Sequence, residues 1–289
     1  MSSPSRAKFY GKLLHDPYRE FRQAIDRPED KIDLGRAALT IALSNYPNLD
    51  IAQYLGRIDQ LAVEAVSHGG AEADVYRAVA ALNYVLFSQH GYRGNAGDYY
   101  DPRNSFLNQV IERKIGIPIT LSVLYLEVAQ RIGLALEGVN FPGHFLVKHE
   151  SDGVEIFIDP FHAGELKTRE DLSAMLDRLN GAKVTFRPEF LATAGKKQIL
   201  KRMLGNLKAI YLRDGDFGQV LSVFDRLIIL DPVAAEEIRD RGLVYFEVED
   251  FSQAREDFET YLRLAPDARD AAAIREQLAR LAKRGTLVH

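Results

Sequence analysis

The chain of 289 residues is long enough for two domains, and its 46% hydrophobic content supports a sizeable buried core. It has 37 lysines and arginines against 41 aspartates and glutamates, so it lacks the overall positive charge that attracts nucleic acid or acidic lipid. The absence of cysteine excludes disulfide bonds, a thiolate nucleophile and zinc–cysteine sites.

The sequence shows no signal for export or membrane insertion. The N-terminal segment, residues 1–16, has no apolar region of the kind found in a signal peptide. No stretch reaches the roughly 18 uninterrupted apolar residues that a membrane span requires. We therefore expect a cytoplasmic protein that contacts neither membrane nor nucleic acid.

The first hundred residues have the spacing of amphipathic helices. Apolar residues recur every three or four positions over Ile32–Val66, and a break at residues 46–48 predicts two helices in this range. A third helix is predicted over about Ala71–Phe87, followed by a polar loop over His90–Asp101. We assign residues 1–100 to a helical N-terminal part.

Residues 101–192 predict an α+β core that packs with the N-terminal part as one domain. Pro118 occupies a position that suits the first turn of a helix, and Ile119–Ile132 is almost entirely apolar, which predicts a central helix. The hydrophobic period then changes to two, which is typical of antiparallel strands, and residues 151–153 form a hairpin signal. The predicted strands are Val139–Phe141, Phe145–Lys148, Glu155–Ile158 and Val184–Arg187.

The C-terminal part, residues 197–289, contains a repeat of 34 residues. The matching pairs include Tyr211 with Tyr245, Asp216 with Asp250, Phe217 with Phe251, Gln219 with Gln253, Phe224 with Phe258, Leu230 with Leu264 and Pro232 with Pro266. This period and its closing proline resemble the tetratricopeptide repeat (TPR). The pattern predicts two helix pairs with the aromatic residues buried between layers, and a further helix over Arg269–Lys283 that caps the array.

A histidine and an aspartate are the main candidate catalytic residues. His144 follows a Pro-Gly break after one predicted strand, and Asp159 ends another, so strand pairing places an imidazole beside a carboxylate. Such a pair orients the base in a nucleophilic triad. A histidine at a glycine bend is also compatible with a purely structural hydrogen bond, and this alternative remains open.

A metal site is a second alternative for the same region. His144, Asp159 and His162 carry the donor atoms of a site with one carboxylate and two histidines, provided that strand and loop converge. The sequence has no helical or hairpin pattern of paired histidines in support, so we expect no resident metal or other cofactor.

Five segments carry a resemblance to a known family. They are Asp101–Val110, Gly116–Tyr125, Arg131–Gly133, Gly138–Val147 and Ile158–Phe161. Together they resemble the bacterial SirB-type family of transglutaminase-like proteins with a C-terminal TPR tail. The resemblance implies a papain/transglutaminase-like core, in which a cysteine at the start of the central helix acts with a histidine on one strand and an aspartate on the next. By that pattern His144 and Asp159 match the histidine and the aspartate.

The cysteine of that pattern has no counterpart here. Its position falls at Ile117 or Pro118, and neither side chain can attack a carbonyl. Thr120 and Ser122 carry hydroxyl groups in the same helix, but a catalytic role requires a shift of register. Alternatively, Thr120 binds first-turn N–H groups and Ser122 is a small residue in a tight helix–sheet contact.

Further candidate binding residues lie around the predicted core site and in the repeats. The tyrosines at positions 92, 99 and 100 are expected either to line a groove above the sheet or to pack on the helices of their own loop. The full set is Tyr99, Tyr100, Asn104, Pro118, Asn140, Tyr211 and Tyr245.

Two functions are compatible with these features. The missing nucleophile and the helical repeats favour a non-catalytic transglutaminase-like protein that binds a protein or peptide through its TPR groove, with a regulatory role acting through that partner. The alternative is a hydrolase or amide-processing enzyme in which His144 and Asp159 act with water, a displaced hydroxyl or a metal ion. Thioester chemistry is not expected, because it requires a thiolate.

Overall fold

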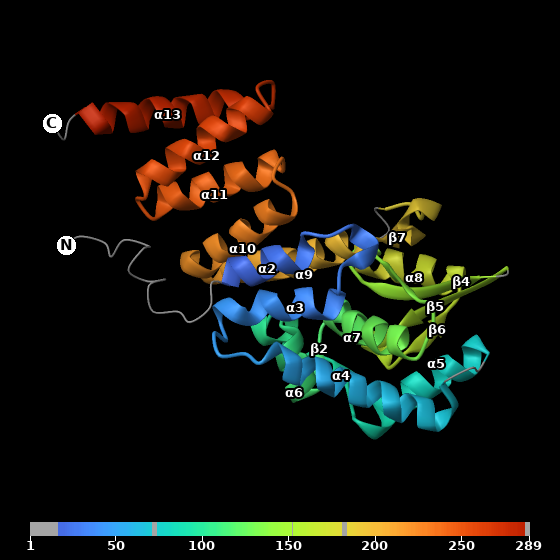
Figure 1. Cartoon of the computed structure of the whole chain (residues 1–289). Coiled ribbons are helices and arrows are strands. Elements are labelled where there is room, and N and C mark those ends of the chain that lie inside the picture. The colour runs from blue at the N-terminus through green and yellow to red at the C-terminus, as the bar shows by residue number, and fades with distance from the viewer. Residues whose placement is uncertain (1–16, 71–73, 152, 181–183, 287–289) are drawn as a thin grey trace. The chain divides into compact units, whose positions relative to one another are not determined.

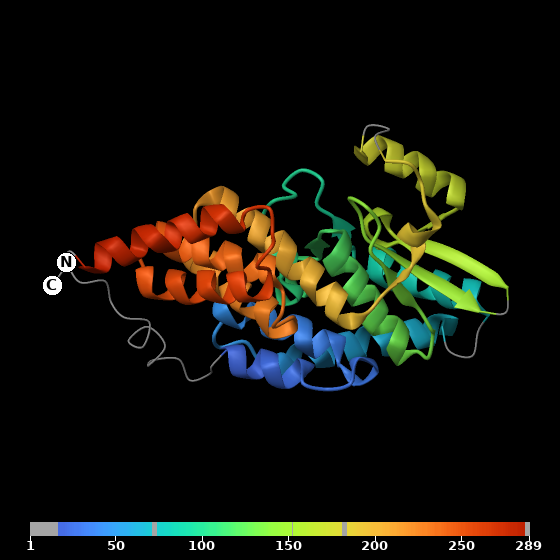
Figure 2. The same ribbon diagram turned by 90° about the horizontal axis from the view of Figure 1, so that it is seen from above.

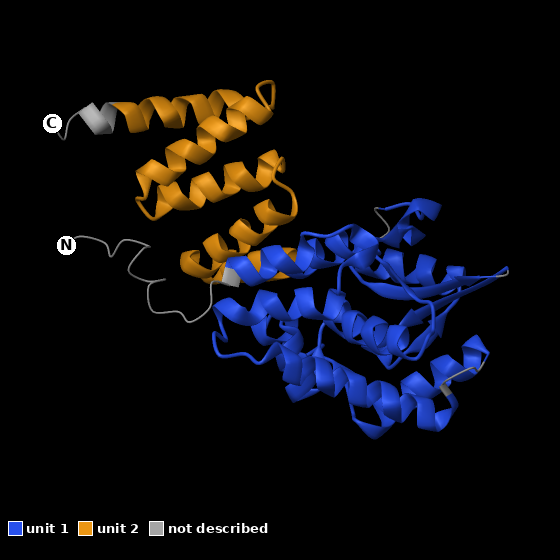
Figure 3. Cartoon of the chain, in the orientation of Figure 1, with its two compact units in different colours: residues 1–203 blue, residues 204–289 orange. Residues whose placement is uncertain are grey.

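The computed structural model describes four segments of the chain, residues 17–70, 74–151, 153–180 and 184–286 (Figure 1). Three features considered above lie outside these segments: the N-terminal segment examined for a signal peptide, the first residues of the helix predicted from Ala71, and Asp152 in the predicted hairpin turn. The chain divides into two compact units, residues 1–203 and 204–289 (Figure 3). The finer division of the first unit at residue 100, and the start of the repeat module at residue 197, remain predictions.

The first part of unit 1 is helical. Its α-helices are α2 (Pro17–Ile25), α3 (Leu34–Ile41), α4 (Ile51–Ala65) and α5 (Val75–Asn83). An aspartate precedes each of α3, α4 and α5 and accepts a backbone N–H of the first turn, which stabilises the helix start. The segment Val66–Gly70, which is kinked at His68 and Gly69, follows α4, and the π-helical turn Tyr84–Gln89 follows α5. The helix predicted over Ala71–Phe87 is thus regular only in α5 and ends in a π-helical turn.

An antiparallel sheet forms the second layer of unit 1. Within the described segments its five strands have the order β6-β5-β4-β3-β7. They are β3 (Glu137–Val139), β4 (Leu146–Ser151), β5 (Val154–Asp159), β6 (Glu165–Lys167) and β7 (Thr193–Ala194). In the register of β4 and β5, Val147 lies opposite Ile158. The predicted pairing of these two strands is therefore confirmed.

The strand predicted at Val184–Arg187 is wrong, because these residues form no strand. Val184 and Phe186 instead pack on a hydrophobic cluster built from the sheet and from α8 (Arg169–Asn180). Alternating apolar residues therefore cover a helix–sheet core here without joining the ladder. The edge strand beside β3 is β7.

The central helix α7 (Pro118–Arg131) packs against α3 and α4 and against strands β3 and β4. Every residue of its first half, Pro118–Tyr125, is buried, as the apolar pattern predicts. Figure 2 shows α8 on one side of the sheet and the N-terminal helices on the other. The predicted α+β core, a central helix on an antiparallel sheet, is confirmed.

Shorter elements complete unit 1. They are the 3-10 helices η1 (Glu29–Lys31), η2 (Ala42–Ser44), η5 (Pro102–Ser105), η6 (Pro160–His162) and η7 (Pro188–Leu191), the helix α6 (Leu107–Arg113), and the parallel pair β1 (Arg93–Gly94) and β2 (Ile115–Gly116). The pair β1–β2 ends directly before Ile117 and α7.

Unit 2 consists of stacked helices, and α9 (Lys196–Asp214) crosses the boundary into it. The others are α10 (Phe217–Leu230), α11 (Ala235–Glu247), α12 (Phe251–Leu264) and α13 (Ala271–Thr286). The repeated aromatic residues Tyr211, Phe224, Tyr245 and Phe258 are all buried, so the two predicted helix pairs are confirmed. None of the helices in the described residues has the length and hydropathy needed to cross a membrane.

Candidate functional site

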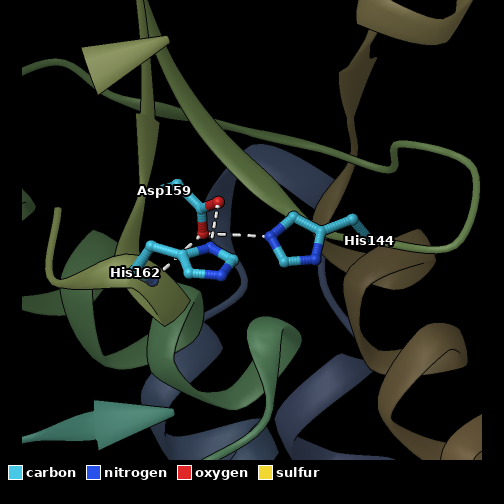
Figure 4. Close-up of side chains that lie close together, drawn as sticks. All are labelled: His144, Asp159 and His162. Atoms are coloured by element: carbon cyan, nitrogen blue, oxygen red, sulfur yellow. Dashed lines mark hydrogen bonds and ion pairs between the residues drawn. The ribbon is translucent and has the colours of Figure 1, made fainter. Parts of the chain in front are cut away.

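His144, Asp159 and His162 form a hydrogen-bonded cluster in unit 1 (Figure 4). His144 Nε2 lies 2.9 Å from Oδ1 of Asp159, and His162 Nδ1 lies 2.7 Å from Oδ2. The carboxylate thus sits between two imidazole rings. The proximity of His144 and Asp159 is what the strand pairing predicts, and the strand and loop converge so that His162 joins them.

The end of β5 fixes the Asp159 carboxylate. Asp159 is the N-cap of η6, and its Oδ1 accepts the backbone N–H groups of Phe161 at 3.1 Å and of His162 at 3.4 Å. Proline follows it directly, and Pro160 suits the first position of a helical turn because it has no N–H to satisfy. The Asp-Pro-Phe-His sequence therefore folds into a short capped turn that holds the carboxylate in one orientation.

A tight turn after β3 places His144. Gly143 has φ of 77°, a left-handed conformation that favours glycine, and the backbone N–H of His144 donates to the carbonyl of Phe141. The flanking Phe141 and Phe145 are fully buried, which anchors the turn. His144 itself is buried, whereas the side chain of His162 is 51% exposed.

Electrostatics set the hydrogen-bond directions in the cluster. Burial alone would raise the pKa of Asp159, but the hydrogen bonds and charge interactions with His144 and His162 lower it below its ordinary value. An ionised carboxylate only accepts hydrogen bonds, so His144 Nε2 and His162 Nδ1 donate. The remaining nitrogens, Nδ1 of His144 and Nε2 of His162, make no hydrogen bond within the described part of the chain.

Within the described residues, no hydrogen bond links His144 to a side chain at the start of α7. Ile117 and Pro118 are buried apolar residues. The Thr120 hydroxyl donates to the Asn104 carbonyl at 2.7 Å and accepts the Ile117 N–H at 3.2 Å. Ser122 is buried, and its hydroxyl has no hydrogen-bond partner in the described residues. Thr120 thus performs the structural role considered for it, and neither hydroxyl is bonded to His144.

The candidate binding residues of unit 1 stabilise loops. The buried Asn104 side chain donates to the carbonyls of Asp98 and Tyr99 and so closes the loop before η5. Asn140 accepts a hydrogen bond from Arg202 at 3.1 Å. The rings of Tyr99 and Tyr100 meet edge to face at 5.4 Å, and Tyr100 is exposed. Tyr100 and Asn140 are therefore the residues of this group that are exposed to solvent.

The candidate binding residues of unit 2, Tyr211 and Tyr245, lie in its hydrophobic interior. Their burial fits packing between helices and does not offer their rings to a bound peptide. The exposed apolar residues on the same two helices are Leu212 of α9 and Leu243 of α11, each just over 40% exposed. The repeat pattern alone could not identify them, because they are not part of the repeated set.

A cavity of about 510 Å³ in unit 1 lies away from the cluster. It is bounded by the C-terminal end of α7, by β3 and β7, and by the start of α9, and Glu127 is one of its lining residues. Glu127 is buried and paired with Arg131 at 2.7 Å. The sequence marks Glu127 as one of the few polar positions in an apolar helix, but nothing in the sequence indicates the cavity.

Comparison with known proteins identifies the two parts of the chain. A model of the transglutaminase-like superfamily matches residues 52–205, and a tetratricopeptide repeat model matches residues 207–279. A UPF0162 protein of Xylella fastidiosa (strain 9a5c) is 37% identical over 265 residues, which cover 90% of this chain and 94% of that protein. A UPF0162 protein of Vibrio cholerae is 29% identical over 88% of this chain and 94% of its own length.

A further similarity covers only part of the chain. F-box only protein 21 of Homo sapiens is 37% identical over 143 residues, which are 47% of this chain and 22% of that protein. No solved structure matches the chain. The matches to both family models and to full-length bacterial relatives show that the chain belongs to the UPF0162 family of SirB-like proteins, with a transglutaminase-like core followed by TPR repeats.

Proposed function

We propose that the chain is a non-catalytic transglutaminase-like protein that binds a protein or peptide partner through its TPR module. The observation that carries this proposal is the start of α7, where buried Ile117 and Pro118 stand in place of a nucleophile. Since the chain contains no cysteine, no other thiolate can replace it. The transglutaminase-like fold is thus retained without the group that performs acyl transfer.

The repeat module supports the binding part of the proposal. TPR repeats generally mediate protein–protein interaction, and stacked helix pairs build extended concave surfaces. Leu212 and Leu243 lie on α9 and α11, which are the first helices of the two pairs, and both are partly exposed. Exposed apolar side chains on the first helix of each pair can provide hydrophobic contacts for a bound peptide. A regulatory role would act through this partner.

Affinity capture with the full-length chain tests the proposal. The bait proteins are the wild type, Leu243→Glu, and Val63→Glu as a control, since Val63 is an exposed apolar residue of α4 in unit 1. We expect a partner that the wild type and the control retain and that Leu243→Glu releases. Binding through the repeats would be contradicted if Leu243→Glu retained every partner of the wild type. It would also be contradicted if the wild type retained no partner.

A hydrolytic function is the second candidate, and the intact His144–Asp159 pair is the observation in its favour. Hydrogen bonding to the carboxylate leaves Nδ1 of His144 as the basic atom of the ring, which is the arrangement that activates a water molecule. Amide hydrolysis that disappears in His144→Ala would establish this function in place of the adaptor.

A further inference from the structure

The cluster of His144, Asp159 and His162 has the composition of a metal site. Two imidazole nitrogens and a carboxylate oxygen lie within 4.8 Å of one another. Nitrogen and oxygen donors of this kind suit first-row divalent ions such as Zn²⁺, Fe²⁺ or Mn²⁺. Figure 4 shows the rings of His144 and His162 on either side of the Asp159 carboxylate, each hydrogen-bonded to it.

The donor separations are close to those around a single ion. With metal–ligand bonds of about 2.1 Å, two donors on one ion lie no more than about 4.2 Å apart. His144 Nε2 lies 2.9 Å from Oδ1 of Asp159 and His162 Nδ1 lies 2.7 Å from Oδ2, so each nitrogen is within this limit of one carboxylate oxygen. The donor atoms of the three residues lie within 4.8 Å of one another, which is slightly more than this limit, so the donors must move closer to bind one ion. His162 can make this movement because half of its side chain is in solvent.

The surroundings of the donors resemble the outer shell of a metal site. The backbone N–H groups of Phe161 and His162 hold Oδ1 of Asp159, and outer hydrogen bonds of this kind orient metal-binding carboxylates. Asp159, at the end of β5, and His144, in the turn before β4, are buried, whereas His162 is open to solvent. An ion can therefore enter from the side of His162.

We propose that His144, Asp159 and His162 bind one divalent transition-metal ion, of the zinc class, through His144 Nε2, His162 Nδ1 and a carboxylate oxygen. In the bound state each imidazole is neutral, gives up its hydrogen bond to Asp159 and carries its one proton on the other ring nitrogen. One carboxylate and two neutral imidazoles leave the bound ion with a net positive charge. Its remaining position is thus suited to water or to an anionic ligand. This inference does not depend on binding through the repeats.

Metal titration of the full-length chain, prepared without a histidine tag, tests the proposal. Calorimetry with Zn²⁺ gives the stoichiometry and affinity, and the visible spectrum of added Co²⁺ reports the ligand geometry. The variants are His162→Ala and His144→Gln, with His68→Ala as the control, since His68 is an exposed histidine remote from the cluster in sequence and hydrogen bonding. Circular dichroism shows whether each variant is folded.

The expected result is one ion per chain in the wild type and in His68→Ala. His162→Ala should weaken binding about 100-fold or more, because even outer-shell partners contribute about 10–100-fold to metal affinity. His162 is half exposed, so its removal tests binding without removing a buried side chain. Absence of binding below about 100 µM metal, or an affinity in His162→Ala within about tenfold of the wild type, would overturn the proposal. Neither result would bear on partner binding by the repeats.

Discussion

At the scale of single residues, four hydrogen bonds fix the carboxylate of Asp159 in the candidate site. Its carboxylate is fully buried, and two imidazole N–H groups and two backbone N–H groups donate to it. A buried carboxylate is costly unless such donors surround it, and here they keep it ionised. The hydrogen bonds of the cluster therefore stabilise the fold as well as orient His144.

Replacement of Asp159 by alanine should lower the free energy of unfolding by about 3 kcal/mol near neutral pH, because four donors lose their acceptor. The folded-state pKa of Asp159 lies below the ordinary value of 3.8. Its stabilising effect is therefore fully present above that value and is lost as the pH falls through the lowered pKa. Urea unfolding at a series of pH values should show the difference between wild type and variant narrowing below about pH 4.

The control for this prediction is Asp177→Ala, which removes an exposed carboxylate from α8. It should change the free energy of unfolding by no more than about 0.5 kcal/mol at any pH. A constant difference between wild type and Asp159→Ala over the whole series would mean that ionisation of Asp159 contributes nothing to stability.

At the scale of elements, the sequence predicts the helices and strands that have a long hydrophobic pattern. The apolar run gave α7 to within one residue at each end, and the pairing of β4 with β5 followed from alternation around a hairpin signal. The strands β6 and β7 are too short for a period to be recognised. The alternation at Val184–Arg187 has the spacing of a strand but reflects packing on α8, which only the tertiary structure reveals.

In the candidate site, too, some contacts can be predicted from the sequence and others are revealed only by the structure. Strand pairing and the family pattern predict from the sequence that His144 and Asp159 lie close together. The contact of His162 with the same carboxylate depends on the capped turn η6, whose direction a sequence does not specify. The cavity beside Glu127 is formed by segments far apart in the sequence, so no local pattern indicates it.

The C-terminal end of α7 contains a buried ion pair with a measurable effect. Burial raises the pKa of Glu127, although the hydrogen bond and charge of Arg131 oppose that shift. Arg131→Ala should cost about 3 kcal/mol of unfolding free energy near neutral pH, because it leaves a buried carboxylate unpaired. The added change Glu127→Gln should recover more than about 1 kcal/mol by removing that charge.

The pH dependence of Arg131→Ala has a definite sign. Since the pKa of Glu127 is raised in the folded state, ionisation of this group opposes folding as the pH rises above its ordinary value of 4.5. Urea unfolding should therefore show Arg131→Ala losing stability relative to Arg131→Ala/Glu127→Gln between about pH 4.5 and pH 7. A double-mutant cycle with no coupling between the two positions would refute the ion pair.

The packing of the repeats leads to a prediction for Phe258. Its ring is fully buried between α11 and α12, and a Cβ added at Gly242 would lie only 2.8 Å from it. Phe258→Ala should cost about 3 kcal/mol or more, since it opens a cavity in a closely packed contact. Phe258→Leu keeps most of the volume and should cost less than about 1.5 kcal/mol. A loss below about 1 kcal/mol for Phe258→Ala in urea unfolding would show that the ring does not fill this core.

At the scale of the whole molecule, the chain joins a transglutaminase-like core to a repeat module of a kind that generally mediates protein binding. The core keeps the imidazole and carboxylate of the family pattern, while apolar side chains occupy the start of the central helix. The retained pair stabilises the turn after β3 and the end of β5 whether or not a reaction occurs there. The absence of cysteine bears on the thioester reaction and not on these contacts.

This separation of fold and reaction gives the prediction for the intact chain. The wild type should show neither amine incorporation into glutamine substrates nor cysteine-protease activity, because a thioester intermediate requires a thiolate. His144→Ala should leave the measured rates at the background of the assay. It should, however, lower the free energy of unfolding by about 1–3 kcal/mol, since the buried Asp159 carboxylate loses one of its donors.

His149→Ala is the matched control, because His149 lies in β4, close to His144 in sequence, but bonds only to the Ala135 carbonyl. Activity above background that is lost in His144→Ala and kept in His149→Ala would show that the His144–Asp159 pair performs catalysis with a nucleophile other than a thiol.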